Sequence, residues 1–169
     1  ASDVYKRQVS ELKKAYAELE NMVIYDQLTG VYSMYSFMEH CKQYDEYNGS
    51  VAVVVCDINH LSDINIQYGQ KAGNQALINV AGVLKKILMD RAYIARINEC
   101  NFVAVMKNVT DAEAGKTFEQ IKRVVEKECN NGKFGVTIEY GIAMRKASNR
   151  WIMDIVHEAV NNMRDRKGR

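Results

Sequence analysis

Residues 51–57 read VAVVVCD, an apolar run that ends at an acid. Valine favours the extended backbone, and a run of this length without polar alternation is typical of a buried strand. Asp57 would then lie at the end of that strand. The run therefore predicts a central strand of a sheet that carries a carboxylate at its end.

The segments around this strand alternate between the two periodicities. Apolar residues at helical spacing predict helices at 33–44, at 60–68, at 76–88, from a cap at Thr110 or Asp111 to Cys129, and from Trp151 to Met163. Apolar runs predict strands at 92–97, 102–107 and 134–144. The polar residues 98–101 between the first two runs predict a hairpin turn.

Once the extra helices are set aside, the order of elements is β-α-β-β-α-β. This is the ferredoxin-like, or split βαβ, plan of the α+β class. We expect an antiparallel-containing sheet with helices on one face, so that the other face or the strand ends stay free for a ligand. Because many unrelated functions use this plan, it names no activity.

Residues 1–24 are predicted to form a separate helix. Apolar side chains recur there at the spacing of a coiled-coil seam: Tyr5, Val9, Leu12, Tyr16, Leu19 and Val23. Two interpretations stay open, a helix packed on its own domain and the end of a coiled coil that joins two protomers to an upstream sensor. We divide the chain into a linker helix at 1–24 and a domain at 25–169, and we interpret Ala1 as the cut end of a longer sensor protein.

Composition argues against several classes of protein. The net charge of +2 and the lack of a long basic run argue against nucleic-acid binding. No apolar run is long enough to cross a bilayer, so no direct membrane contact is expected. The four cysteines lack metal-site spacing, which favours reduced thiols in the cytoplasm, including the inner side of a membrane-bound sensor. The basic C-terminus is interpreted as a solvated helix end: Arg164, Arg166, Lys167 and Arg169.

Four segments, in one order and at one spacing, resemble the GGDEF family of bacterial diguanylate cyclases. Residues 26–32, DQLTGVY, are similar to the family's D-x-L-T-G-L-x opening. The second family pattern is kept at Asp57, Ile58, Asn65, Gly69, Gly73 and Leu77. Residues 95–102, ARINECNF, stand where the family has A-R-x-G-G-D/E-E-F, and residues 136–143, VTIEYGIA, are close to V-T-x-S-x-G-I-A. The resemblance covers about residues 25–169 and implies the GGDEF fold.

The signature motif itself is overwritten. Of G-G-D/E-E-F only Phe102 remains, since the other positions are Asn98, Glu99, Cys100 and Asn101. The family's lysine, histidine and second guanine-binding acid are replaced by Ser62, Gln70 and Asn74. The family's inhibitory R-x-x-D motif would fall at residues 89–92, MDRA, and is absent.

Members of the family join two GTP molecules into cyclic di-GMP across a dimer, which requires a divalent metal. The resemblance assigns that metal to Asp57, to the carbonyl of Ile58 and to a hairpin carboxylate, where this chain has Cys100. Mg²⁺ prefers hard oxygen ligands, and a thiol is soft. Asp57 is therefore either a vestigial metal ligand or a cap of the next helix. Glu99 could replace the lost carboxylate only if the turn is remodelled.

The resemblance assigns guanine recognition to Asn65 and Asn74. Guanine presents paired donors, which a carboxylate accepts together and an amide does not, so Asn74 weakens guanine binding by about 1–3 kcal/mol. The two signature glycines permit a positive φ or a close approach of the nucleotide, and the side chains of Asn98 and Glu99 would project into that space. We expect a pocket that is partly filled and poor in metal ligands.

We therefore predict a cyclase-like signalling domain without catalytic activity, which acts as a relay or dimerisation module. Its expected partners are an upstream sensor domain and a second copy bound through residues 1–24. One alternative is a regulator that binds GTP without turnover, and another is an active cyclase with a non-standard turn. No cofactor is predicted with certainty, and Mg²⁺ is expected only if a nucleotide binds.

Overall fold

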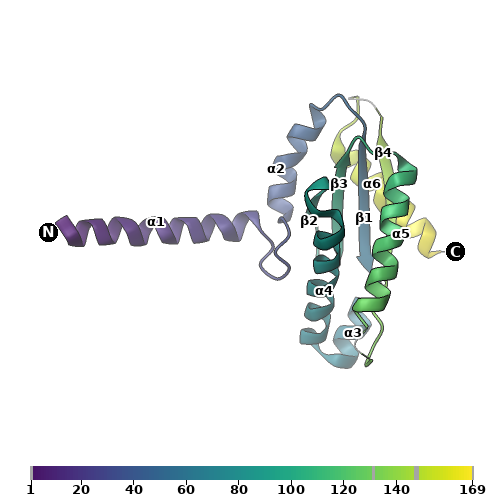
Figure 1. Cartoon of the computed structure of the whole chain (residues 1–169), viewed down its shortest axis with the longest axis horizontal. Helices are drawn as coiled ribbons and strands as arrows, with labels where there is room; N and C mark the ends of the chain where they lie inside the picture. The colour runs from purple at the N-terminus through teal and green to yellow at the C-terminus, as the bar shows by residue number, and fades with distance from the viewer. Residues whose placement is uncertain (1, 131, 147–148, 169) are drawn as a thin grey trace.

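The computed structural model describes residues 2–130, 132–146 and 149–168, so Ala1 and Arg169 lie outside the described residues. Within them, four strands form one sheet in the order β2-β3-β1-β4, and each neighbouring pair is antiparallel. The strands are β1 (Val51–Ile58), β2 (Tyr93–Arg96), β3 (Asn101–Lys107) and β4 (Ile138–Arg145). This is the predicted ferredoxin-like order, with the valine-rich strand in an inner position (Figure 1).

The helices follow the apolar spacing seen in the sequence. They are α1 (Ser2–Ile24), α2 (Met34–Asp45), α3 (Leu61–Tyr68), α4 (Gln70–Leu88), α5 (Asp111–Glu128) and α6 (Ile152–Lys167), with a 3₁₀ turn η1 (Met89–Arg91) after α4. Ser33 and Thr110 begin α2 and α5, because each side chain accepts a backbone N–H of the first turn. Thr110 and Glu113 form a complete capping box.

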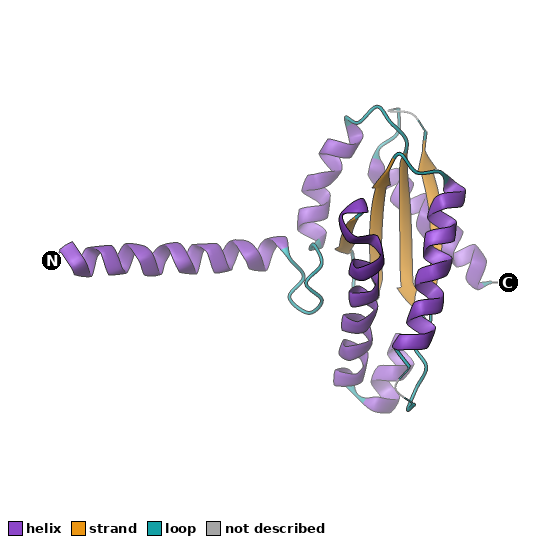
Figure 2. Ribbon diagram, viewed as in Figure 1, coloured by secondary structure: helices purple, strands orange, loops and turns teal. Residues whose placement is uncertain are grey.

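Helices cover both faces of the sheet (Figure 2), so the expectation of one free face was wrong. Val54 and Cys56 point to the face covered by α4 and α5, whereas Val53 and Val55 point to the face covered by α2 and α6. Successive strand residues face opposite sides, so an apolar run without alternation presents hydrocarbon on both. The ends of the strands are thus the positions left for a site.

β4 begins at Ile138, later than the start of the strand predicted at 134–144. Its partner β1 ends at Ile58, which pairs with Ile138, so the preceding residues have no strand beside them. The backbone N–H of Asn59 donates to the carbonyl of Thr137 (2.9 Å) just beyond the last strand pair. The length of β1 therefore sets the length of β4.

α1 projects away from the rest of the molecule (Figure 1), and no described residue of this helix is buried. The seam residues Tyr5, Leu12, Tyr16 and Leu19 are exposed. The interpretation of a helix packed on its own domain was therefore wrong. Although α1 is long, no helix in the described part of the chain is both long and apolar enough to cross a membrane.

Candidate functional site

Asp57 lies at the end of β1, on the face that α6 covers. Strand alternation places it in line with Val53 and Val55, and its neighbours across the sheet are Asn101 on β3 and Glu139 on β4. Its side chain is 16% exposed. The fold therefore brings the predicted metal-binding acid beside the signature turn at 98–101.

The Asp57 carboxylate forms an ion pair with Lys167 in the last turn of α6. Oδ2 accepts a hydrogen bond from Lys167 Nζ, whereas Oδ1 is buried and has no hydrogen-bond partner among the described residues.

This geometry corrects two predictions made from the sequence. Asp57 does not cap α3, since the N-cap residue is His60, which makes no side-chain cap bond. The basic end of α6 is more than a solvated helix end, because Lys167 belongs to the site.

Cys100 is a neighbour of Asp57 and carries its proton at neutral pH. Burial raises the pKa of the Cys100 thiol to about 11, and the negative charge of Asp57 acts in the same direction. The ammonium of Lys167 lowers this pKa by a smaller amount. Since the thiolate is the form that binds metals, a neutral Cys100 is a poor metal ligand as well as a soft one.

The signature turn is closed by the side chain of Asn98. Its Oδ1 accepts the backbone N–H groups of Cys100 (3.0 Å) and Asn101 (2.9 Å), in the manner of an Asx turn. Neither Asn98 nor Glu99 is among the described residues with a positive φ. The turn is thus built without the backbone freedom of glycine. Phe102, the surviving signature residue, is a core residue with 1% exposure.

Glu99 is exposed and lines a shallow cavity of about 370 Å³ together with Asp26, Ser33, Arg96 and neighbouring residues. Its backbone carbonyl accepts a hydrogen bond from Arg96 (2.8 Å). Across residues 2–130, 132–146 and 149–168, no group of three His, Cys, Asp or Glu side chains converges to hold a metal ion. The lining of that cavity includes Glu99 but not Asp57, so the two carboxylates are not brought together there.

The two asparagines assigned to guanine recognition lie on α3 and α4. Asn74 Oδ1 accepts a hydrogen bond from Gln70 Nε2 (3.0 Å), one turn earlier in α4. Asn65 Oδ1 is buried and lacks a hydrogen-bond partner in the part of the chain that the structure describes. It lies against Gly73, where an added Cβ would be only 1.7 Å from it. Asn74 thus already uses its acceptor oxygen within α4, whereas the buried acceptor of Asn65 is left without a partner among the described residues.

The residues present do not fit a divalent metal ion. Mg²⁺ requires several hard oxygen ligands in near-octahedral geometry. Asp57 already pairs with the ammonium of Lys167, the neighbouring Glu139 pairs with Lys122, and Cys100 is a neutral thiol. The unpartnered Oδ1 of Asp57 is a single oxygen, and a cation that bound it would have to compete with Lys167.

A second polar cluster connects the end of α1 with the turn. The Asp26 carboxylate accepts hydrogen bonds from the backbone N–H (2.9 Å) and the hydroxyl (2.6 Å) of Thr29, and pairs with Arg96 (3.3 Å). Arg96 also donates to the carbonyls of Asn98 (3.1 Å) and Glu99 (2.8 Å). Arg96 thus holds the segment after α1 and the signature turn together, a link that the motif positions alone did not indicate.

Lys167 was not predicted as part of the site, although the sequence of α6 carries a signal for it. Ala159 and Met163 are buried on α6, and Lys167 follows them at the same four-residue spacing. It therefore continues the face of α6 that packs on the sheet. Extending the buried stripe by one turn would have placed a cation near the end of β1.

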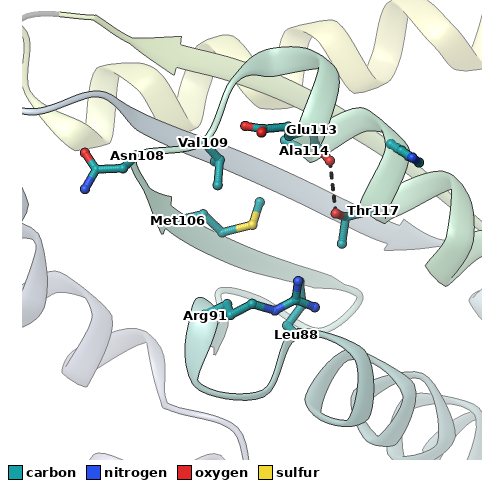
Figure 3. Close-up of a pocket in the computed structure, with 9 residues that line it drawn as sticks. Leu88, Arg91, Met106, Asn108, Val109, Glu113, Ala114 and Thr117 are labelled. Atoms are coloured by element: carbon teal, nitrogen blue, oxygen red, sulfur yellow. Dashed lines mark hydrogen bonds between the residues drawn. The ribbon is translucent and has the colours of Figure 1, made fainter.

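A separate cavity of about 310 Å³ lies where α4 ends and α5 begins (Figure 3). Its lining residues include Leu88, Arg91, Met106 and Thr117. Met106 pairs with Ala52 near the start of β1, whereas the candidate site lies at the end of that strand. This cavity is therefore distinct from the cluster at Asp57.

The fold, together with the acid at the end of β1 and the turn beside it, defines a GGDEF-type domain. A family model described as "Diguanylate cyclase, GGDEF domain" matches residues 23–169, and the chain belongs to this family.

Among curated proteins, the chain is 29% identical over 143 residues to the uncharacterized protein YtrP of Bacillus subtilis, which covers 83% of this chain and 24% of YtrP. It is 24% identical over 132 residues to diguanylate cyclase DgcS of Shewanella oneidensis, which covers 76% of this chain and 44% of DgcS. The chain thus spans less than half the length of these curated relatives.

Solved structures share the fold. The coiled coil and GGDEF domain of DgcB from Caulobacter crescentus, in complex with c-di-GMP, has a TM-score of 0.85 at 20% identity and covers 98% of this chain and 92% of that chain. The S helix-GGDEF-EAL structure of LapD from Vibrio cholerae, bound to c-di-GMP, has a TM-score of 0.77 at 19% identity. The match covers 97% of this chain and 38% of that chain. In both comparisons the match extends over nearly the whole chain.

Proposed function

We propose that this chain is a GGDEF domain without cyclase activity, which serves as a relay or dimerisation module of a longer signalling protein. One observation carries the proposal: the carboxylate at the family's metal position is paired with Lys167 beside a neutral Cys100. Attack of a 3′-hydroxyl on the α-phosphate of GTP, with pyrophosphate as the leaving group, requires metal charge to neutralise the triphosphate. A site whose carboxylate is already neutralised by an ammonium does not hold the metal ion.

The recognition positions support the same proposal. The acceptor oxygen of Asn74 is occupied by Gln70, and Ser62 stands where the family has a lysine. The proposal thus includes weak binding of guanine and of phosphate, in addition to the loss of metal.

α1 supports the dimerisation part of the proposal. Its seam alternates Tyr5, Leu12 and Leu19 with Val9, Tyr16 and Val23, which places leucine at d positions and valine at a positions. That pattern favours parallel two-stranded coiled coils. A helix of this length with no buried residue is marginal on its own, and a second copy would bury the seam.

The contacts at the base of α1 support the relay part of the proposal. The Ser33 hydroxyl donates to the carbonyl of Val23, and the Ser33 N–H donates to the carbonyl of Ile24 (2.8 Å). The same Ser33 caps α2, and Asp26 nearby is tied to the signature turn through Arg96. A rotation of α1 imposed by an upstream sensor domain would thus be passed to α2 and to the turn.

We include a cytoplasmic location in the proposal, either free or on the inner side of a membrane-bound sensor. Cys41, Cys56, Cys100 and Cys129 are free thiols, as expected in a reducing compartment.

A turnover assay tests the proposal. The protein is incubated with GTP and Mg²⁺ or Mn²⁺, and cyclic di-GMP is sought by chromatography, with an active diguanylate cyclase as the positive control. We expect no product from this chain. Steady formation of cyclic di-GMP that Asp57→Ala abolishes would establish the alternative of an active cyclase with a non-standard turn.

A second candidate is a regulator that binds GTP without turnover. The observation in its favour is that Asp57 Oδ1 and Asn65 Oδ1 are both buried without a hydrogen-bond partner among the described residues. Buried acceptors of this kind are commonly satisfied by a ligand or a water. Calorimetry with GTP and Mg²⁺ decides between the candidates. Saturable heat that is lost in Asn65→Ala would favour the regulator, and no heat at millimolar nucleotide would exclude it.

A further inference from the structure

We infer that Lys167 is a built-in counter-ion of Asp57, an ammonium that takes the place of a metal ion and closes this position to divalent cations. This inference rests on the proposed function and deepens it. It concerns the binding of a cation, whereas the proposed function concerns turnover of GTP.

The position of Lys167 is fixed by the packing of α6. Ala159 and Met163 are buried against the sheet, and Lys167 follows one turn later. Gly141 on β4 allows the backbone of α6 to lie very close, since an added Cβ would be 2.1 Å from the Ala159 carbonyl oxygen and 2.3 Å from the Met163 nitrogen. The lysine therefore starts from a backbone that is held in place, on the face to which Asp57 points.

Both members of the ion pair are partly removed from water. The side chain of Asp57 is 16% exposed and that of Lys167 is 36% exposed. Opposite charges attract more strongly in such an environment than in bulk water. A hydrated divalent cation that reached Asp57 would have to displace an ammonium already held there by the fold.

The neighbouring carboxylate is also paired. Glu139, beside Asp57 across the sheet, pairs with Lys122 of α5 (3.2 Å). Arg166 of α6 adds a further positive charge that acts on Glu139. A divalent cation would therefore have to compete with cations that already neutralise Asp57 and Glu139, which disfavours its binding.

The cysteine of the signature turn fits the same arrangement. A carboxylate at position 100 would place another acidic side chain beside Asp57, and this chain has a cysteine there instead. Cys100 and Lys167 thus act together. The cysteine removes a carboxylate that would bind a metal ion, and the lysine supplies a positive charge in place of that ion.

The test restores the acid and removes the internal cation. Mn²⁺ binding is titrated by electron paramagnetic resonance of the free ion in Cys100→Asp/Lys167→Met and in Cys100→Asp/Arg164→Met. Arg164 is the matched control, because it lies in the same last turn of α6 and removes the same charge. We expect the Lys167 variant to bind Mn²⁺ at least about tenfold more tightly, given the strength of close charge pairs in partly buried sites. Equal affinities in the two folded variants would overturn the inference.

A second measurement does not depend on the added acid. Lys167→Met is expected to lower the melting temperature by roughly 2–4 °C more than Arg164→Met, and the extra loss should disappear when Asp57→Asn is present as well. Additive shifts, or saturable Mn²⁺ binding by the unmodified protein that Asp57→Asn abolishes, would overturn the inference. Neither the Mn²⁺ titration nor the melting experiment measures cyclic di-GMP. Failure of this inference is therefore distinguishable from failure of the proposed function.

Discussion

At the scale of single residues, Gly141 controls how closely α6 lies on the sheet. An added Cβ there would collide with the backbone of Ala159 and Met163, and backbone atoms of a packed helix do not move aside singly. Position 141 therefore requires a residue without a side chain for steric reasons. The sequence identified this glycine as part of a family motif without its physical reason.

We predict that Gly141→Ala lowers the free energy of unfolding by about 2–3 kcal/mol, because α6 has to shift away from β4. Gly82→Ala is the matched control, since nothing lies within 4 Å of the added Cβ in α4. Alanine in a helix is more stable than glycine by about 1 kcal/mol, so this variant should be stabilised. Urea unfolding measures both variants. A Gly141→Ala variant as stable as the parent chain would contradict the packing described for α6.

The candidate site shows what residue-level patterns can and cannot predict. The motif spacing identified Asp57 and Cys100, and the strand period put Asp57 at a strand end. The partner of Asp57 is 110 positions away along the chain. No local pattern joins two residues at that separation, because only the packing of α6 on β1 and β4 brings them together.

At the scale of elements, α1 is the helix whose apolar seam has no partner in the described structure. We predict that Leu12→Glu with Leu19→Glu converts a dimer into a monomer in sedimentation experiments, because buried like charges oppose each other at the seam. Lys14→Glu, two residues from Leu12 and outside the seam, is the control and should leave the dimer intact. A parent chain that is monomeric at high micromolar concentration would refute dimerisation through residues 1–24.

Arg145 joins the ends of several elements from within the core. Its side chain has 0% exposure. It donates hydrogen bonds to the carbonyls of Asp45 (2.8 Å), Tyr47 (2.9 Å) and Arg150 (2.7 Å). It thus connects the end of β4 with the end of α2 and with the segment before α6.

We predict that Arg145→Met destabilises the fold by about 3 kcal/mol, since three hydrogen bonds made by a fully buried side chain are lost. Arg145→Lys should recover only part of this loss, because one ammonium cannot span the same acceptors. Arg150→Met, which removes an exposed ion pair with Glu158, is the control and should change stability by less than about 1 kcal/mol. Chemical denaturation compares the variants, and a loss at Arg145 no larger than at Arg150 would show that the buried bonds contribute little.

Most helices and strands could be predicted from the sequence, since their apolar periodicity is set by the faces they bury. The start of β4 could not, because it depends on where β1 ends. The second helical layer was missed for a related reason. The run VAVVVC fills both faces of β1, but sequence alone does not say which helices meet which face.

At the scale of the whole molecule, buried thiols link the fold to pH. Burial raises the pKa of Cys41 and of Cys56 from 9.0 to about 12. In the unfolded chain these thiols lose their protons near pH 9, while in the folded chain they keep them until about pH 12. The unfolded state then binds fewer protons, so stability falls as pH rises through this window.

We predict that the free energy of unfolding, measured under reducing conditions, declines between about pH 9 and pH 11. Tyrosines whose pKa is raised by burial, such as the partly buried Tyr93 and the buried Tyr140, add to the decline. The combined variant Cys41→Ala/Cys56→Ala should therefore show a shallower slope, even though its stability at neutral pH is lower. An unchanged slope in that variant would exclude the thiols as the cause.

The group that occupies the carboxylate of Asp57 decides whether this domain can bind a metal ion. The most direct measurement is a crystal structure of the protein with Mg²⁺ and a non-hydrolysable GTP analogue. We predict that Lys167 Nζ remains on Asp57, with no metal ion between that carboxylate and residues 98–101. A magnesium ion bound by Asp57 and the carbonyl of Ile58, with Lys167 displaced, would contradict it.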